Sequence, residues 1–173
     1  MAEALTVQAE ICAKYQFCAA DGEALAPPYF DNVSREYCGK LSYLGSTHYE
    51  RMRCCGYDPQ KRLFGCPIEV KQPYGFGAAH FPGSHEYVLT CVDLGAGLTP
   101  VALDDVHLAN AVSGSPDWYF AVIARANERL AGQRLDGRTL RARSILSWGL
   151  VPTGCNYSPI WGNAIDYQIR LDP

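Results

Sequence analysis

Alternation of apolar and polar side chains is the strongest pattern in this chain. From Leu5 to Phe17 the odd positions are apolar or aromatic, whereas the even positions are polar residues or cysteine. The same alternation returns at 86–93, at 138–151 and at 165–171. Side chains that alternate with a period of two are typical of half-buried strands. The pattern therefore predicts a protein built from antiparallel strands.

Other segments add shorter strands to this set. They are predicted at 35–44, 49–55, 66–71, 98–108 and 118–125. The last of these, WYFAVIAR, continues to Leu130 in a pattern that also fits a short helix. About eight or nine strands separated by Gly, Pro and Asp-Gly turn signals are typical of a β-sandwich. We predict an all-β fold, an antiparallel β-sandwich or related barrel with long loops, forming a single disulfide-stabilised domain over residues 1–173.

The segment between Cys66 and Cys91 contains the longest predicted loop. From Gln72 to Ser84 the chain carries three glycines and two prolines, which interrupt any regular element. Loops longer than about 12 residues in compact domains are usually functional or disordered. This one is rich in aromatic residues and poor in charge, which is not the composition of disorder. It is therefore the first candidate for a working surface.

Cysteine usage indicates an oxidising compartment. The eight cysteines include no C-x-x-C pair, so zinc-ribbon and thioredoxin-like sites lack their usual spacing. Disulfides are the favoured interpretation, with buried free thiols as the alternative. The disulfide candidates are Cys12, Cys18, Cys38, Cys54, Cys55, Cys66, Cys91 and Cys155. Their connectivity does not follow from the sequence, because eight cysteines allow 105 pairings.

Two further features fit an extracellular (secreted) protein. The sequons at Asn32 and Asn156 match the glycosylation tripeptide, although Pro159 follows the second. The first ten residues have no signal-peptide pattern, and no apolar run reaches the length of a membrane span. We therefore expect a mature secreted segment with an added or processed start and no membrane span.

Charge is low overall but unevenly distributed. The formal net charge is −3, which makes nucleic acid an unlikely partner. Between positions 125 and 143, however, six arginines face only two acidic residues. Arg138, Arg141 and Arg143 lie on a predicted hairpin and are candidates for an anionic subsite.

Aromatic residues in loops suggest the leading functional hypothesis. Rigid aromatic side chains give contact area at low cost in conformational entropy. Tyr74, Phe76 and Phe81 in the long loop, and Trp161 in a second Gly/Pro-containing stretch, are the predicted ligand contacts. For each ring the alternative is a place in the end of the hydrophobic core. We predict a secreted binding module for an extracellular glycan or protein surface.

Two other functions remain open. A small hydrolase, directed at glycan or RNA, would use His80, His85, Glu69 and Glu86 in acid–base catalysis, since imidazole titrates near neutral pH. A non-enzymatic effector or inhibitor would instead show a broad apolar patch without a cleft. No motif in the chain predicts a metal site or a cofactor.

Overall fold

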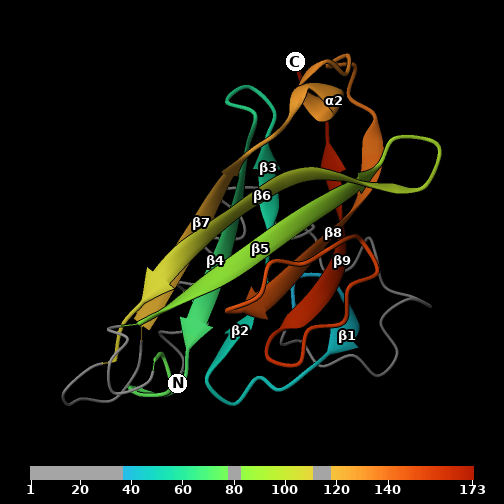
Figure 1. Cartoon of the computed structure of the whole chain (residues 1–173). Helices are drawn as coiled ribbons and strands as arrows, with labels where there is room; N and C mark the ends of the chain where they lie inside the picture. The colour runs from blue at the N-terminus through green and yellow to red at the C-terminus, as the bar shows by residue number, and fades with distance from the viewer. Residues whose placement is uncertain (1–36, 78–82, 111–117) are drawn as a thin grey trace.

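The computed structural model describes residues 37–77, 83–110 and 118–173. These residues form nine strands and one short helix (Figure 1). The elements are β1 (Lys40–Leu44), β2 (Glu50–Met52), β3 (Gly56–Asp58), β4 (Leu63–Val70), β5 (Ser84–Asp93), β6 (Leu98–Leu108), β7 (Trp118–Arg125), α2 (Glu128–Ala131), β8 (Thr139–Trp148) and β9 (Asn163–Arg170). The all-β prediction is confirmed.

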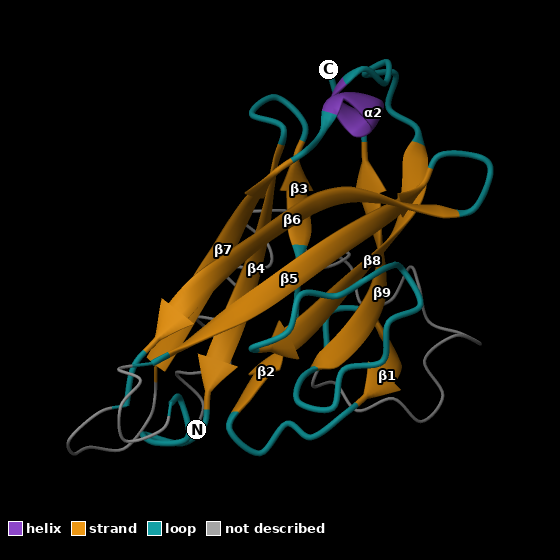
Figure 2. Ribbon diagram, in the orientation of Figure 1, coloured by secondary structure: helices purple, strands orange, loops and turns teal. Residues whose placement is uncertain are grey.

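Two antiparallel sheets form the sandwich. The first has the strand order β1-β9-β8-β5-β6, and the second is built on β4. Strands β2 and β3 follow one another along one edge of β4, and β7 pairs with its other edge. Figure 2 shows that helix is confined to one end, where α2 joins β7 to β8. The sandwich thus has one helical end and one end made of loops.

Alternation along the strands places the core between the sheets. In β4, Phe64, Cys66, Ile68 and Val70 are buried, and the residues between them are partly exposed. In the first sheet, Val88, Leu146 and Ile165 join the same buried cluster. A separate small cluster of Val70, Phe76 and Leu108 fills the loop end. Burial thus alternates with a period of two in β4, as the sequence predicts, whereas consecutive residues are buried in the middle of β5 and β8.

A side chain joins the two sheets where backbone pairing stops. The amide of Asn163, fully buried at the start of β9, accepts a hydrogen bond from the Met52 N–H (3.0 Å) and donates one to the Met52 carbonyl (2.8 Å). The Asn163 amide thus takes the place of a strand partner for β2. Because buried backbone groups need partners, this contact lets β2 lie against β9 without a desolvation penalty.

Three disulfides lie within the described residues. Cys38 pairs with Cys54, Cys55 with Cys66, and Cys91 with Cys155. The adjacent Cys54 and Cys55 thus hold two different neighbours, as expected for consecutive residues of an extended chain. Cys12 and Cys18 lie outside the described residues, as does the predicted strand at 5–17.

Strand boundaries differ from the predictions at a few places. The segment 49–55 gives only β2, and β3 forms in the following stretch, for which the sequence predicts no strand. The strand predicted at 66–71 starts earlier, at Leu63, because β3 and β7 both pair with its first residues. The predicted strand at 118–125 is β7, and the helix beyond it is only four residues long.

Candidate functional site

The loop at 149–162 crosses the outer face of the first sheet and forms the best candidate site. The Cys91–Cys155 disulfide ties the loop to the middle of the sheet, with a Cα–Cα distance of 5.9 Å. Arg143 of β8 adds a second attachment by donating to the Cys155 carbonyl (3.3 Å). The Arg143 side chain is itself fixed by two hydrogen bonds to Asp166, at 2.5 and 2.9 Å. The loop is therefore attached to a rigid base.

The far end of the loop is held by backbone contacts. Ser46 donates to the Ile160 carbonyl (2.8 Å) and accepts from the Gly162 N–H (2.8 Å). Gly162 has φ +114°, and a Cβ there would lie 2.2 Å from the Leu146 carbonyl oxygen. Only glycine fits this approach, since other residues rarely adopt that φ and the added carbon would collide with backbone. This close approach of Gly162 to Leu146 fixes the position of the neighbouring Trp161.

A pocket of about 400 Å³ lies between this loop and the end of β8. Its lining residues are Ser147, Trp148, Gly149, Leu150, Tyr157, Ile160 and Trp161. Three of the seven are aromatic, and Leu150 and Ile160 are 60% and 72% exposed. Pockets of this size with apolar and aromatic walls are typical of sites for small ligands. Among the described residues that line the pocket, Tyr157 is the one with an ionisable side chain.

Hydrogen bonds and ring contacts fix the two tryptophans. The Trp148 indole Nε1 donates to the Ser84 hydroxyl (2.8 Å), and that hydroxyl donates to Glu86 (3.1 Å). The Trp161 ring packs against Tyr49, with centroids 5.5 Å apart. Rings held in this way lose little conformational entropy when a ligand binds.

Behind Trp148 lies a pair of buried carboxyl groups. Glu50 on β2 and Glu86 on β5 are 1% and 0% exposed, and the Glu50 Oε1 and Glu86 Oε2 atoms have no hydrogen-bond partner among the described residues. Burial raises the pKa of Glu86 to about 8, and the nearby Glu50 adds to that rise. Burial also raises the pKa of Glu50 to about 7, against the opposing effect of Lys71. Both groups are therefore protonated in mildly acidic solution.

The predicted ligand contacts fall into different environments. Trp161 lines the pocket, whereas Tyr74 is 55% exposed and lies beside Tyr49 rather than in the pocket. Phe76 is only 1% exposed and belongs to the small core cluster, so its ring offers no surface to a ligand. Phe81 lies outside the described residues. The structure thus brings Tyr74, Phe76 and Trp161 around one ring, that of Tyr49.

The arginines predicted for an anionic subsite differ in their partners. Arg143 is occupied by Asp166 and the loop backbone, which makes it a positioning residue. Arg138 lies 3.6 Å from Asp136 and donates to Gln133. Arg141 is exposed on the outer face of β8. Arg141 and Arg143 thus lie on the same face of β8, and Arg143 is engaged by Asp166.

The hydrolase candidates do not meet either. His85 and Glu86 are consecutive in β5 and point to opposite faces, His85 to solvent and Glu86 into the core. Glu69 lies on the outer face of the second sheet in salt bridges to Arg51 (2.6 Å) and Arg53 (2.7 Å). His80 lies outside the described residues. The described members of this set therefore share no pocket.

His85 has a different partner that the sequence did not suggest. Its Nδ1 lies 2.5 Å from Asp105 of β6, and its ring lies 5.2 Å from that of His107. Cross-strand pairing of β5 with β6 brings these residues together. Within 37–77, 83–110 and 118–173, no group of three or more His, Cys, Asp or Glu side chains is arranged to hold a metal ion.

Sequence patterns did not identify several residues of the site. Ile160 and Glu50 belong to no recognisable motif. The pocket arises because loop 149–162 folds back over β8, a contact that depends on the Cys91–Cys155 pairing. The one signal available was the Gly/Pro-containing stretch around Tyr157 and Trp161.

Comparison with protein-family models, with curated proteins and with solved structures found no match to this chain. In the described part of the chain, no helix has the length and apolar character needed to cross a membrane.

Proposed function

We propose that the protein is a secreted binding module that takes an extracellular glycan into the pocket beside loop 149–162. The observation that carries this proposal is a concave site whose walls are fixed aromatic rings and which has few ionisable groups. The apolar faces of sugar rings stack on Trp and Tyr rings. The indole N–H of Trp and the phenol O–H of Tyr can also form hydrogen bonds with sugar hydroxyls. The three disulfides support an oxidising, extracellular setting.

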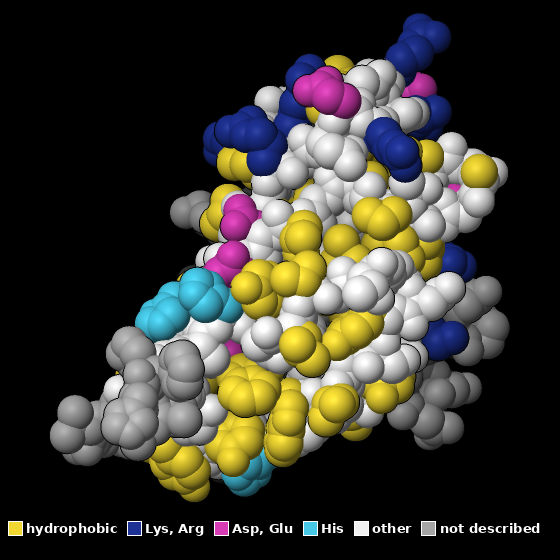
Figure 3. Space-filling model, viewed as in Figure 1, with side chains coloured by type: hydrophobic (Ala, Val, Ile, Leu, Met, Phe, Trp, Pro, Cys, Tyr) yellow, Lys and Arg dark blue, Asp and Glu magenta, His cyan; other side chains and the backbone are white. Residues whose placement is uncertain are grey.

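A protein surface is the second candidate partner. Leu150, Val151 and Ile160 are 60%, 46% and 72% exposed around the mouth of the pocket. In Figure 3, hydrophobic side chains spread across the lower part of the visible face. Exposed apolar side chains around a concave centre are also typical of protein interfaces. The aromatic walls of the pocket favour a glycan, because a sugar ring can stack on them inside a concave site.

A glycan array probed with the folded, non-reduced protein tests this proposal. We expect a defined class of glycans to bind, and Ile160→Glu to weaken that binding at least about tenfold by placing a charge at the pocket mouth. Ile160 is 72% exposed, so this change leaves the fold intact. Tyr119→Ala, which removes a 62% exposed ring from the second sheet, is the control.

Three results would contradict the proposal. They are an empty array, a hit that Ile160→Glu leaves unchanged, and a hit that both variants lose equally. If the array is empty and a captured protein loses binding on Ile160→Glu, the pocket would instead be assigned to a protein partner.

A further inference from the structure

The end of the sandwich that carries α2 is strongly basic. Seven basic side chains lie on the β3–β4 turn, at the end of β7, on the connection from β7 to β8 and at the end of β9. They are Lys61, Arg62, Arg125, Arg129, Arg134, Arg138 and Arg170, which we call the basic end. Figure 3 shows Lys and Arg side chains gathered there, away from the hydrophobic face.

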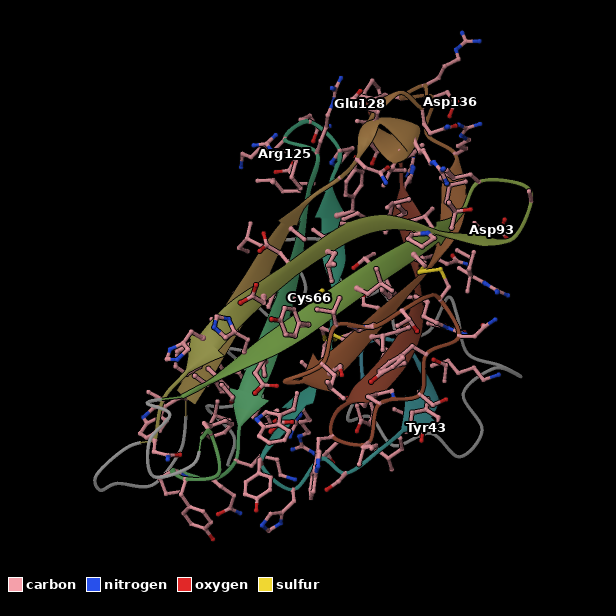
Figure 4. All side chains as sticks on the ribbon, in the orientation of Figure 1. Tyr43, Cys66, Asp93, Arg125, Glu128 and Asp136 are labelled. Carbon is pink, nitrogen blue, oxygen red and sulfur yellow. A yellow bond between two sulfur atoms is a disulfide. The ribbon has the colours of Figure 1, made fainter. Side chains whose placement is uncertain are left out.

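Backbone pairing brings these separate segments together. Arg125 is next to the turn because Leu63 pairs with it, and the Ala126 N–H donates to the Arg62 carbonyl (2.9 Å). On the other side, the Gly137 N–H donates to the Leu171 carbonyl (2.7 Å), and Arg170 Nε donates to the Gly137 carbonyl (3.1 Å). In Figure 4, Arg125, Glu128 and Asp136 lie at this same end, around α2. These contacts gather the basic side chains at one end of the sandwich, with Glu128 and Asp136 among them.

Ion pairs neutralise only part of this charge. Lys61 lies 3.2 Å from Asp58, Arg138 lies 3.6 Å from Asp136, and Arg170 lies 3.0 Å from Asp172. The other four basic side chains have no acidic partner within 4 Å among the described residues. They are Arg62, Arg125, Arg129 and Arg134, all of them exposed. An excess of exposed, unneutralised guanidinium groups attracts anions.

We propose that the basic end binds an acidic polysaccharide through its sulfate or carboxylate groups, at a site separate from the aromatic pocket. Guanidinium groups donate pairs of hydrogen bonds in a geometry that fits such oxyanions. Four guanidinium groups on three neighbouring segments suit a polymer with repeated charges better than a single small anion.

Other polyanions fit this surface less well. Proteins that bind single-stranded nucleic acids stack the bases on aromatic rings, whereas the most exposed aromatic side chains of the described chain, Tyr43, Tyr74 and Tyr119, lie on β1, in the loop after β4 and at the start of β7, away from this end. Acidic polysaccharides are polyanions of the oxidising compartment that the disulfides indicate.

The site is tested with two charge-matched triple variants of the full chain. Arg125→Gln/Arg129→Gln/Arg134→Gln removes three unneutralised charges, whereas Lys61→Gln/Arg138→Gln/Arg170→Gln removes three charges that already have acidic partners. The immobilised probes are heparin, which carries sulfate, and polygalacturonate, which carries only carboxylate; neutral dextran and poly(U) RNA are the comparisons. Thermal unfolding confirms that each variant is folded.

We expect the wild-type protein to bind heparin, polygalacturonate or both, and not dextran. The first variant should weaken that binding about tenfold or more and reduce its salt dependence, while the second should change it less than about threefold. Retention of heparin but not polygalacturonate would assign the site to sulfate groups. Ile160→Glu should leave this binding unchanged, so failure here is distinguishable from failure of the pocket proposal.

Four outcomes would overturn the inference. They are no retention of either acidic polysaccharide, equal losses in the two triple variants, wild-type affinity in the first variant, and equal or stronger retention on poly(U). Equal losses would show a general charge effect, and strong retention on poly(U) would reassign the surface to nucleic acid.

Discussion

The two ends of the sandwich differ in where their ionisable side chains lie. At one end of β4, Val70 pairs with Glu50, whose carboxyl group is buried with that of Glu86 beneath the aromatic side chains. At the other end, Leu63 pairs with Arg125, where guanidinium groups extend into solvent. The loop end keeps its carboxyl groups neutral by burial, whereas the helical end keeps its arginines charged by exposure.

This difference indicates at which end a substitution should change the free energy of unfolding. Buried groups at the loop end interact with the core and with each other, so a change in one alters the free energy of unfolding. Exposed arginines at the helical end interact mainly with water, and surface charges of this kind contribute little to stability. Binding at the basic end should therefore be separable from folding, whereas changes to the buried side chains of the loop end should lower stability.

The largest expected effect comes from Phe76→Ala at the loop end. The Phe76 ring is 1% exposed and packs with Val70 and Leu108, and its backbone N–H donates to Asn110 (2.8 Å). Removing the ring should lower the free energy of unfolding by about 3–5 kcal/mol, mainly through the cavity it leaves. Arg129→Gln at the helical end should change it by less than about 0.5 kcal/mol. Urea unfolding of both variants measures the contrast, and equal losses would contradict it.

The pH dependence of stability should come from the buried carboxyl pair. The pKa values of Glu50 and Glu86 rise on folding from 4.5 to about 7 and about 8. Since folding raises these pKa values, their neutral forms are favoured in the folded state. This contribution is complete below about pH 4.5 and falls as the pH rises toward about 8, with a loss on the order of a few kcal/mol.

Glu86→Gln tests this origin, because an amide does not ionise and can donate to Glu50. The variant should be more stable than the wild type at pH 8.5, and its stability should vary less with pH. Asp104→Asn, on the outer face of β6, is the control for removal of an acidic group. Unfolding in urea at pH 5 and at pH 8.5 gives the comparison. A wild-type stability that increases between these pH values would refute the assignment.

A smaller effect is expected where the pocket loop returns to the sheet. In Gly162→Ala the added carbon meets the Leu146 carbonyl oxygen at 2.2 Å, at a φ of +114°. We expect a loss of about 2 kcal/mol in unfolding free energy and weaker glycan binding, because Trp161 is displaced. Gly97→Ala also has a positive φ, of +97°, but meets no atom within 4 Å, so it measures the backbone strain alone. Equal losses in the two variants would show that the close approach is unimportant.

The sequence predicted local structure well, because strand formation depends on a pattern that neighbouring residues carry. The alternation at 86–93 and 138–151 identified β5 and β8, and the WYFAVIAR segment matched β7. It was less successful between 49 and 62, where β2 and β3 are short strands that form because β4 lies beside them. Disulfides were also expected from composition, and three lie in the described residues.

Tertiary structure alone decided the site. The sequence by itself determined the β class, the enrichment in cysteine and the arginine-rich segment, since these are properties of composition and near neighbours. It did not determine that Phe76 enters the core, that Arg143 binds Asp166, or that Glu50 lies near Glu86. Each of these contacts joins residues from different strands, and its free energy depends on burial that exists only after the two sheets have packed together.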